Sequence, residues 1–113
     1  MVINNLLYID DSERVRSMAE ERLREGLSAN VDMASSYESG LEQMRKKFCD
    51  LVVADGLHGR CFQLAEEARN IRHGRLVIFS LSAGLAEPAR MKGIPFYRKP
   101  EDLDKLISDF AGT

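Results

Sequence analysis

Acidic, hydroxyl and basic side chains follow four of the short apolar runs in this sequence. They are Asp10 and Asp11 after the first run, Asp55 after the third, Ser80 or Ser82 at the fourth, and Lys99 after the fifth. Carboxylates that gather at one place repel one another, and a hard cation with oxygen ligands such as Mg2+ removes that repulsion. A nearby lysine neutralises an incoming phosphate, and a hydroxyl binds one of its oxygens. The set suits in-line phosphoryl transfer, which needs positioning and charge neutralisation.

Each of these residues also has an ordinary explanation. Asp11 could serve only as a helix cap, and Asp55-Gly56 could be only a turn. Lys99 could be a solvated lysine before a proline. These separate explanations predict no common order along the chain, whereas a shared site requires all of the residues at strand ends. The joint pattern therefore favours a site.

The elements that would position these residues alternate along the chain. Strands are expected at residues 2–9, 31–34, 51–54, 76–81 and 94–97. Helices are expected at 13–25, at 62–71, at 86–91 in a poorly defined form, and after Pro100. The first helix would be capped by Ser12 or Asp11 and stopped by Gly26. A further helix, capped by Ser36, would turn inward the side chains of Tyr37, Leu41, Met44 and Phe48.

Five strand–helix pairs without a linker predict one α/β domain over residues 1–113, with a doubly wound parallel sheet. Ligands of such sheets bind beyond the carboxyl ends of the strands, where the side chains named above would lie. The terminal helix would bury Leu103, Leu106, Ile107 and Phe110.

Composition argues against several other classes of protein. Sixteen basic residues against eighteen acidic ones leave a net charge of −2, which gives no reason to expect nucleic-acid binding. No apolar run approaches the length of a membrane span, so we expect no membrane partner. Cys49 and Cys61 have no metal-ligand spacing, and we expect reduced thiols in a cytoplasmic protein.

Four segments resemble the receiver domains of two-component response regulators. They are Leu-Leu-Tyr-Ile-Asp10-Asp11-Ser, Asp-Leu-Val-Val-Ala-Asp55, Ile-Phe-Ser-Leu-Ser82-Ala-Gly and Phe96-Tyr-Arg-Lys99-Pro100. The resemblance covers essentially the whole chain. It implies a flavodoxin-like (βα)5 fold with strand order 2-1-3-4-5.

The resemblance also implies a metal site and a phosphoacceptor. Asp10, Asp11 and Asp55 would hold Mg2+ together with the backbone carbonyl of Leu57. Asp55 would take the phosphoryl group from a histidine kinase or a histidine phosphotransfer protein. The output partner would be another protein.

A hydroxyl and Lys99 would then bind the phosphate, and Phe96 would reorient as the aromatic switch residue. Ser82 is the preferred hydroxyl, because receivers place a small residue after this position. Ala83 follows Ser82, whereas the bulky Leu81 follows Ser80.

Two departures from the family pattern affect the expected loops. The segment after Asp55 lacks the usual proline, so we expect a looser loop in which His58 or Arg60 approaches the phosphate. The stretch from Ser82 to Lys99 is short, which predicts an abbreviated fourth helix with Pro88 near its start.

Three functions remain open. The preferred one is a phosphorylation-controlled switch that is no enzyme and stands alone as a receiver. Its partner surface would lie between Leu85 and Phe110, with Arg90, Tyr97 and Lys105 exposed. The second is a pseudo-receiver that binds proteins independently of phosphorylation. The third is a phosphatase with an aspartate nucleophile, which would need a second acid where Leu57 stands.

Overall fold

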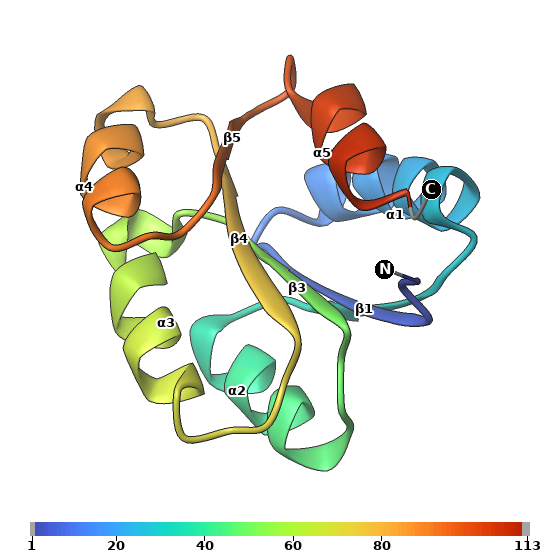
Figure 1. The fold of residues 1–113 in the computed structure, drawn as a ribbon, viewed down its shortest axis with the longest axis horizontal. Coiled ribbons are helices and arrows are strands. Elements are labelled where there is room, and N and C mark those ends of the chain that lie inside the picture. The colour runs from blue at the N-terminus through green and yellow to red at the C-terminus, as the bar shows by residue number, and fades with distance from the viewer. Residues whose placement is uncertain (1, 112–113) are drawn as a thin grey trace.

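A computed structural model of the chain describes residues 2–111 and shows alternating strands and helices (Figure 1). The strands are β1 (Asn5–Ile9), β2 (Asn30–Ala34), β3 (Leu51–Ala54), β4 (Arg75–Ser80) and β5 (Phe96–Arg98). The helices are α1 (Glu13–Leu27), α2 (Tyr37–Lys46), α3 (Cys61–Ala68), α4 (Ala86–Met91) and α5 (Leu103–Phe110). Two short 3-10 turns, η1 (Leu57–Gly59) and η2 (Ala83–Leu85), follow β3 and β4.

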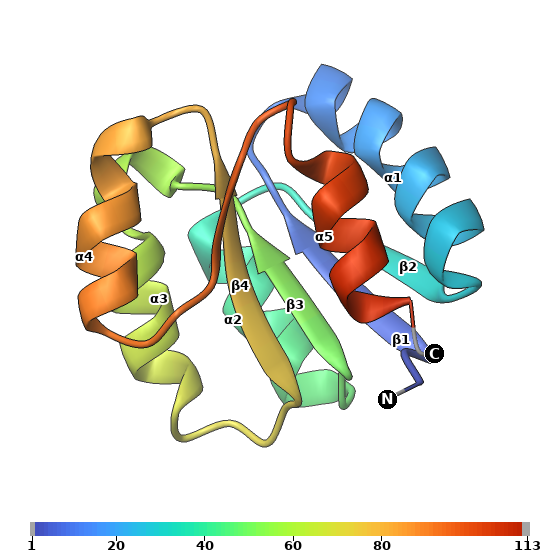
Figure 2. The same ribbon diagram turned by 45° about the horizontal axis from the view of Figure 1, so that its top comes forward.

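The strands form one parallel sheet in the order β2-β1-β3-β4-β5. Helices α1 and α5 cover one face of the sheet, and α2, α3 and α4 cover the other (Figure 2). This arrangement confirms the predicted flavodoxin-like (βα)5 fold and its strand order. The reversal of strand order at β1 and β3 puts a binding crevice at their carboxyl ends.

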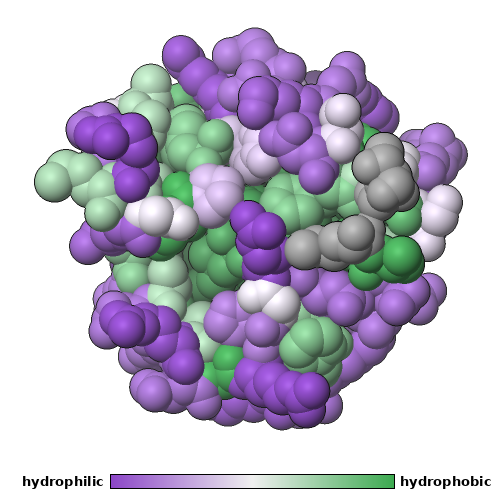
Figure 3. All heavy atoms as spheres, viewed as in Figure 1, coloured by the Kyte–Doolittle hydropathy of each residue, from purple (hydrophilic) through white to green (hydrophobic). Residues whose placement is uncertain are grey.

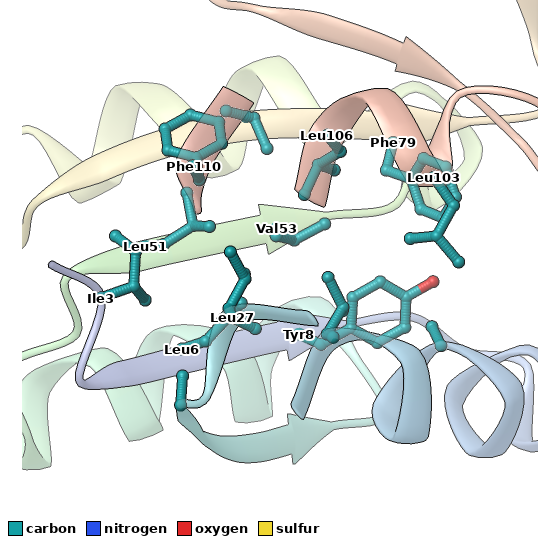
Figure 4. Close-up of a cluster of buried hydrophobic side chains, with 14 of the residues drawn as sticks. Ile3, Leu6, Tyr8, Leu27, Leu51, Val53, Phe79, Leu103, Leu106 and Phe110 are labelled. Carbon is teal, nitrogen blue, oxygen red and sulfur yellow. The ribbon is translucent and has the colours of Figure 1, made fainter. Parts of the chain in front are cut away.

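The central strands are apolar throughout because both of their faces are buried. On the side of α1 and α5, a cluster includes Leu6 and Tyr8 of β1, Val53 of β3 and Phe79 of β4 (Figure 4). Alternate residues of the same strands, such as Leu7 and Val52, pack toward α2 and α3. This layering holds β1 and β3 rigidly beside each other.

Serine caps begin the two helices that follow β1 and β2. The Ser12 hydroxyl accepts a hydrogen bond from the Val15 amide at 3.3 Å, so the first cap is Ser12 rather than Asp11. Ser36 and Ser39 cap α2 reciprocally through side-chain and backbone bonds, which confirms the predicted cap at Ser36. Asp11 is therefore left without a capping role.

The end of α1 differs from the prediction. The helix continues to Leu27, and Ser28 ends it in the left-handed region at φ 51°. Gly26 lies inside the last turn instead, where an added Cβ would come within 2.6 Å of the Ile107 side chain. The close packing of α1 on α5 leaves no room for a side chain at this position, which explains why it is a glycine. Met18 and Arg22 of α1 are exposed.

Other boundaries also moved. Helix α2 ends before Phe48, whose side chain is exposed instead of turned inward. Leu81 lies beyond the end of β4 and is exposed. Helix α5 begins at Leu103, three residues after Pro100, and Ile107 is only partly buried. Strand β1 starts at Asn5, later than expected. None of these shifts changes the residues at the strand ends.

Helix lengths bear on two expectations. Helix α4 has only six residues, with Pro88 at its third position, so the abbreviated fourth helix is confirmed. Among the helices of residues 2–111, none combines the length and apolar character that a membrane crossing would require.

Candidate functional site

The carboxyl ends of four strands meet at one edge of the sheet. Just past the strands, the Asp55 amide donates to the Ile9 carbonyl at 2.8 Å, which joins the ends of β3 and β1. The Lys99 amide donates to the Ser80 carbonyl at 3.0 Å, which joins the ends of β5 and β4. Parallel register thus gathers residues that lie far apart in the sequence.

Three carboxylates converge at this edge, as predicted. Asp10, Asp11 and Asp55 each offer an oxygen, and these oxygens lie within 4.8 Å of one another. Their exposure is graded, with side-chain values of 1% for Asp10, 17% for Asp55 and 49% for Asp11. The Asp55 side chain is therefore mostly buried but still accessible to solvent.

Lys99 bridges the two inner carboxylates. Its ammonium donates to Asp10 Oδ2 through a short contact and to Asp55 Oδ1 at 2.6 Å. The lysine side chain is 6% exposed, so this ion pair is nearly removed from water. Two clustered negative charges therefore share one buried positive charge, and the mutual repulsion expected from the sequence is already reduced.

Asp10 is held from several directions. Oδ1 accepts from the Ser12 amide at 2.9 Å, and Oδ2 accepts from the Tyr8 hydroxyl at 2.8 Å. Arg16 donates to the Asp10 carbonyl oxygen at 2.6 Å. Burial is the main cause that raises the pKa of Tyr8, and the negative charge of Asp10 is the second. The Tyr8 hydroxyl therefore keeps its proton. Our sequence analysis missed both Tyr8 and Arg16, and the only signal was a hydroxyl inside an apolar strand.

The loop after Asp55 is a hydrogen-bonded turn rather than the loose segment we expected. Leu57, His58 and Gly59 all have positive φ, at 50°, 56° and 88°. The turn is closed by a bond from the Gly59 amide to the Gly56 carbonyl at 2.9 Å. Two non-glycine residues in the left-handed region are uncommon, and such conformations concentrate at functional sites.

Three residues of this loop were predicted to approach the site. The Leu57 amide donates to Asp55 Oδ2 at 3.1 Å, while its carbonyl, the predicted metal ligand, accepts from the Arg60 amide at 3.0 Å. His58 does reach the cluster, with Nε2 3.1 Å from Asp11 Oδ2. The Arg60 guanidinium instead stacks 3.9 Å from the centre of the Tyr37 ring, directed away from the cluster.

The two candidate hydroxyls occupy different positions. Ser80 is buried at the end of β4, and a Cβ added to Gly56 would lie 2.8 Å from its oxygen. Its hydroxyl also accepts from the Ser82 amide at 3.1 Å. Ser82 is exposed. Both serines line a hollow of about 380 Å3 beside Asp55.

A larger hollow of about 540 Å3 lies elsewhere, between α3 and the start of β4 and β5. Its lining includes Phe62, Arg69, Leu76 and Lys92. No converging set of carboxylates lines it, so size alone does not locate the chemistry in this protein.

The residues of the acidic cluster fit Mg2+. The ion prefers carboxylate and carbonyl oxygens and keeps several waters, and the exposed Asp11 leaves room for those waters. Asp10, Asp11 and Asp55, each of which offers an oxygen, would hold it. Bound there, the ion would neutralise charge on a phosphate and on the carboxylates.

Millimolar Mg2+ should raise the melting temperature of this protein, because ligand binding to the native state stabilises it. At ten times the dissociation constant the gain is roughly 1.4 kcal/mol. Asp11→Asn should remove most of the gain while leaving the metal-free midpoint nearly unchanged, since Lys99 already neutralises the inner carboxylates.

Sodium chloride at equal ionic strength is the control for this melt. Asp32→Asn, at a half-buried acid on β2 that pairs with Lys47 away from the cluster, is the matched variant and should keep the gain. A wild-type midpoint that ignores Mg2+ would contradict a metal site here.

Comparisons with solved structures identify the fold. A response regulator receiver domain protein from Clostridium thermocellum matches 96% of this chain and 94% of its own, with TM-score 0.79 and 23% identity. A response regulator from Burkholderia pseudomallei, solved with a phosphorylated aspartic acid, a calcium ion and citrate, matches 95% of this chain and 66% of its own, with TM-score 0.76 and 18% identity.

An adenylate cyclase from Rhodopirellula baltica is also similar, with TM-score 0.76 and 18% identity over 96% of this chain and 87% of its own. No family model matches the sequence, and no curated protein is similar enough to count as a relative. The chain therefore has the fold of the response regulator receiver domains. At these identities the likeness concerns architecture, and the activity must be argued from the site.

Proposed function

We propose that this protein is a phosphoacceptor receiver domain that takes a phosphoryl group on Asp55 from a histidine kinase or a histidine phosphotransfer protein. The observation that carries the proposal is the ammonium of Lys99, which lies 2.6 Å from Asp55 Oδ1 beside a hollow large enough for a phosphate. A carboxylate at that place has a cation ready for the charge that it would acquire.

In the proposed reaction, a carboxylate oxygen of Asp55 attacks the phosphorus of a phosphohistidine. The phosphorus–nitrogen bond breaks, the imidazole leaves with its electron pair, and an acyl phosphate forms. Lys99 then follows the new charge, and the Leu57 amide, 3.1 Å from Asp55 Oδ2, holds the carboxyl plane. Bound Mg2+ would supply further charge neutralisation. Positioning and electrostatics carry such transfers.

The hydroxyl that binds the phosphoryl group is Ser80 in this proposal, with Ser82 as the alternative. Beryllium fluoride with Mg2+ imitates the phosphoryl group, and its affinity should fall about tenfold in Ser80→Ala, as expected for one hydrogen bond to a charged group. Ser82→Ala should bind nearly as wild type, because Ser82 lies exposed at the rim. The reverse order of effects would restore Ser82.

The proposed output surface is formed by α4, β5 and α5. Figure 3 shows hydrophobic residues reaching the surface on the side where α4 lies, and Met91 is 75% exposed. Arg90 and Lys105 are exposed, as predicted for partner contacts. Tyr97 was predicted to be exposed as well, and this is wrong. It is buried, and its hydroxyl donates to Asp109 at 2.7 Å.

Phe96 remains the proposed switch residue. It is half-buried on β5, three residues before Lys99, and packs with the small cluster of Cys61, Ile78 and Ala89 beneath α4. A shift of Lys99 would reach Phe96 along the chain, because Lys99 directly follows β5.

The competing function is a pseudo-receiver, which the left-handed loop after Asp55 favours. Backbone NMR with Mg2+ and beryllium fluoride separates the two. We expect shifts that spread from Asp55 through Ser80 to Phe96. A wild-type protein that shows no shift would be a pseudo-receiver, and shifts that stop at the loop would contradict signalling through β5.

The proposal treats the protein as a cytoplasmic switch rather than an enzyme. Leu57 stands where a phosphatase would need a second acid, and its side chain is buried. Cys49 and Cys61 are free and buried, and burial raises the pKa of both thiols, which suits a reducing compartment.

A further inference from the structure

One oxygen of Asp10 has two donors that come from opposite ends of the chain. Oδ2 accepts from the Tyr8 hydroxyl at 2.8 Å and from the Lys99 ammonium through a short contact. The Asp10 side chain is 1% exposed, so water has little access to this oxygen. If one donor leaves, the other must hold the negative charge.

The proposed function requires Lys99 to leave. The same ammonium binds Asp10 and Asp55 in the resting structure, and a phosphoryl group on Asp55 adds close to two negative charges next to it. The ammonium is then drawn toward the phosphoryl oxygens. Without the Tyr8 hydroxyl, Asp10 Oδ2 would have no donor left once Lys99 moved, and the buried carboxylate would oppose this movement.

We infer that Tyr8 is a positioning residue that keeps Asp10 hydrogen-bonded while Lys99 transfers its ammonium to the phosphoryl group. This inference rests on the proposed function of Asp55. It adds a role for a residue in the core strand β1 that touches neither phosphate nor metal. The Tyr8 hydroxyl thereby lowers the free energy of the phosphorylated arrangement relative to the resting one.

The surroundings of Tyr8 support this role. The side chain is 0% exposed, and its ring packs in the core against Phe79, with ring centroids 6.5 Å apart (Figure 4). A phenylalanine would fill nearly the same space without a buried hydroxyl. Burial of a hydroxyl is unfavourable unless the hydroxyl is hydrogen-bonded. The contact with Asp10 supplies that bond.

Tyr97 offers a matched control. It is also buried, its hydroxyl also donates to an aspartate, and the bond to Asp109 on α5 has nearly the same length at 2.7 Å. Tyr8→Phe and Tyr97→Phe each delete one such bond. A merely structural role for Tyr8 would leave the affinity for beryllium fluoride alike in the two variants.

The test measures the affinity of each protein for beryllium fluoride in saturating Mg2+ by 19F NMR, beside its affinity for Mg2+ alone and its melting temperature. Both variants should melt somewhat below wild type. Tyr8→Phe should bind beryllium fluoride about tenfold more weakly, since Lys99 can no longer leave Asp10 without stranding a charge. Its Mg2+ affinity should change much less, and Tyr97→Phe should bind both ligands as wild type.

Equal beryllium fluoride affinities in Tyr8→Phe and wild type would overturn the inference and leave the proposed function standing. Equal losses for Mg2+ and beryllium fluoride would also overturn it, because Tyr8 would then act on the metal. A wild-type protein that binds no beryllium fluoride would overturn both proposals.

A measurement on the wild type keeps the inference open to test if Tyr8→Phe does not fold. The 13C shift of the Tyr8 ring carbon that bears the hydroxyl should move when beryllium fluoride binds, because the remaining bond to Asp10 strengthens. The same carbon of Tyr97 should move less. An unmoved Tyr8 signal in protein that binds beryllium fluoride would contradict the inference.

Discussion

Replacing Lys99 by methionine should lower the free energy of unfolding by about 3 kcal/mol in metal-free buffer at neutral pH. The substitution keeps much of the volume of the side chain but removes the charge that Asp10 and Asp55 share. Removing one partner of a buried ion pair leaves the other charge uncompensated, and this costs more than the pair itself contributes. Urea unfolding with and without Mg2+ measures the loss, and Mg2+ should restore part of it.

Lys105→Met is the matched control. This lysine also pairs with an aspartate, Asp109, at 3.2 Å, but the two side chains are 67% and 42% exposed. Exposed pairs contribute about 0–1 kcal/mol, so the control should unfold close to wild type. Equal losses in the two variants would contradict the electrostatic account of the site.

Replacing Asp55 by asparagine should abolish covalent labelling by acetyl phosphate while leaving the fold intact. Asparagine has nearly the same shape as aspartate but cannot form the acyl phosphate. Asp10 keeps its bonds to Tyr8, Ser12 and Lys99 in this variant, so the edge of the sheet stays in place. Intact-protein mass spectrometry measures the labelling, and circular dichroism checks the fold.

Two other variants sharpen this experiment. Asp32→Asn removes a half-buried acid from β2 that pairs with Lys47, and it should label as wild type. Asp11→Asn should label slowly through weakened Mg2+ binding. A result in which Asp55→Asn still labels and Asp11→Asn does not would make Asp11 the acceptor.

The fold could be predicted well because its signals are local and repeated. Leu51–Ala54 is apolar at every position, as expected of a strand buried on both faces, and Asp55 follows directly. The parallel register then decides which strand ends are neighbours, so Asp10, Asp55 and Lys99 could be placed together from order alone. Boundaries were less certain, because exposure of Phe48 and Leu81 depends on neighbours from distant segments.

The contacts inside the site could not be predicted in the same way. The sequence pattern prefers Ser82 on the size of the following residue. It does not reveal that Ser80 is the buried hydroxyl at the end of β4, which the register shows. Tyr8 sits in an apolar run and was treated as core. Its hydroxyl matters because Asp10 lies two residues on, above the same face of the sheet.

Tyr97 shows the opposite failure. A tyrosine on a short edge strand is expected to be exposed. The Tyr97 hydroxyl instead donates a hydrogen bond to Asp109, twelve residues later, and its ring packs with residues of α5. Burial is the main cause that raises the pKa of Tyr97, and the hydrogen bond to Asp109 is the second. Side-chain pairs between a strand and the helix that follows it need the turn geometry, which the sequence alone does not supply.

Mapping the phosphorylated residue in the wild-type protein tests the central claim most directly. The protein is incubated with acetyl phosphate with and without Mg2+, and any acyl phosphate is reduced with borohydride before peptide mass spectrometry. We expect modification at a single residue, Asp55, and only when Mg2+ is present. Modification at any other residue, or no modification under these conditions, would contradict it.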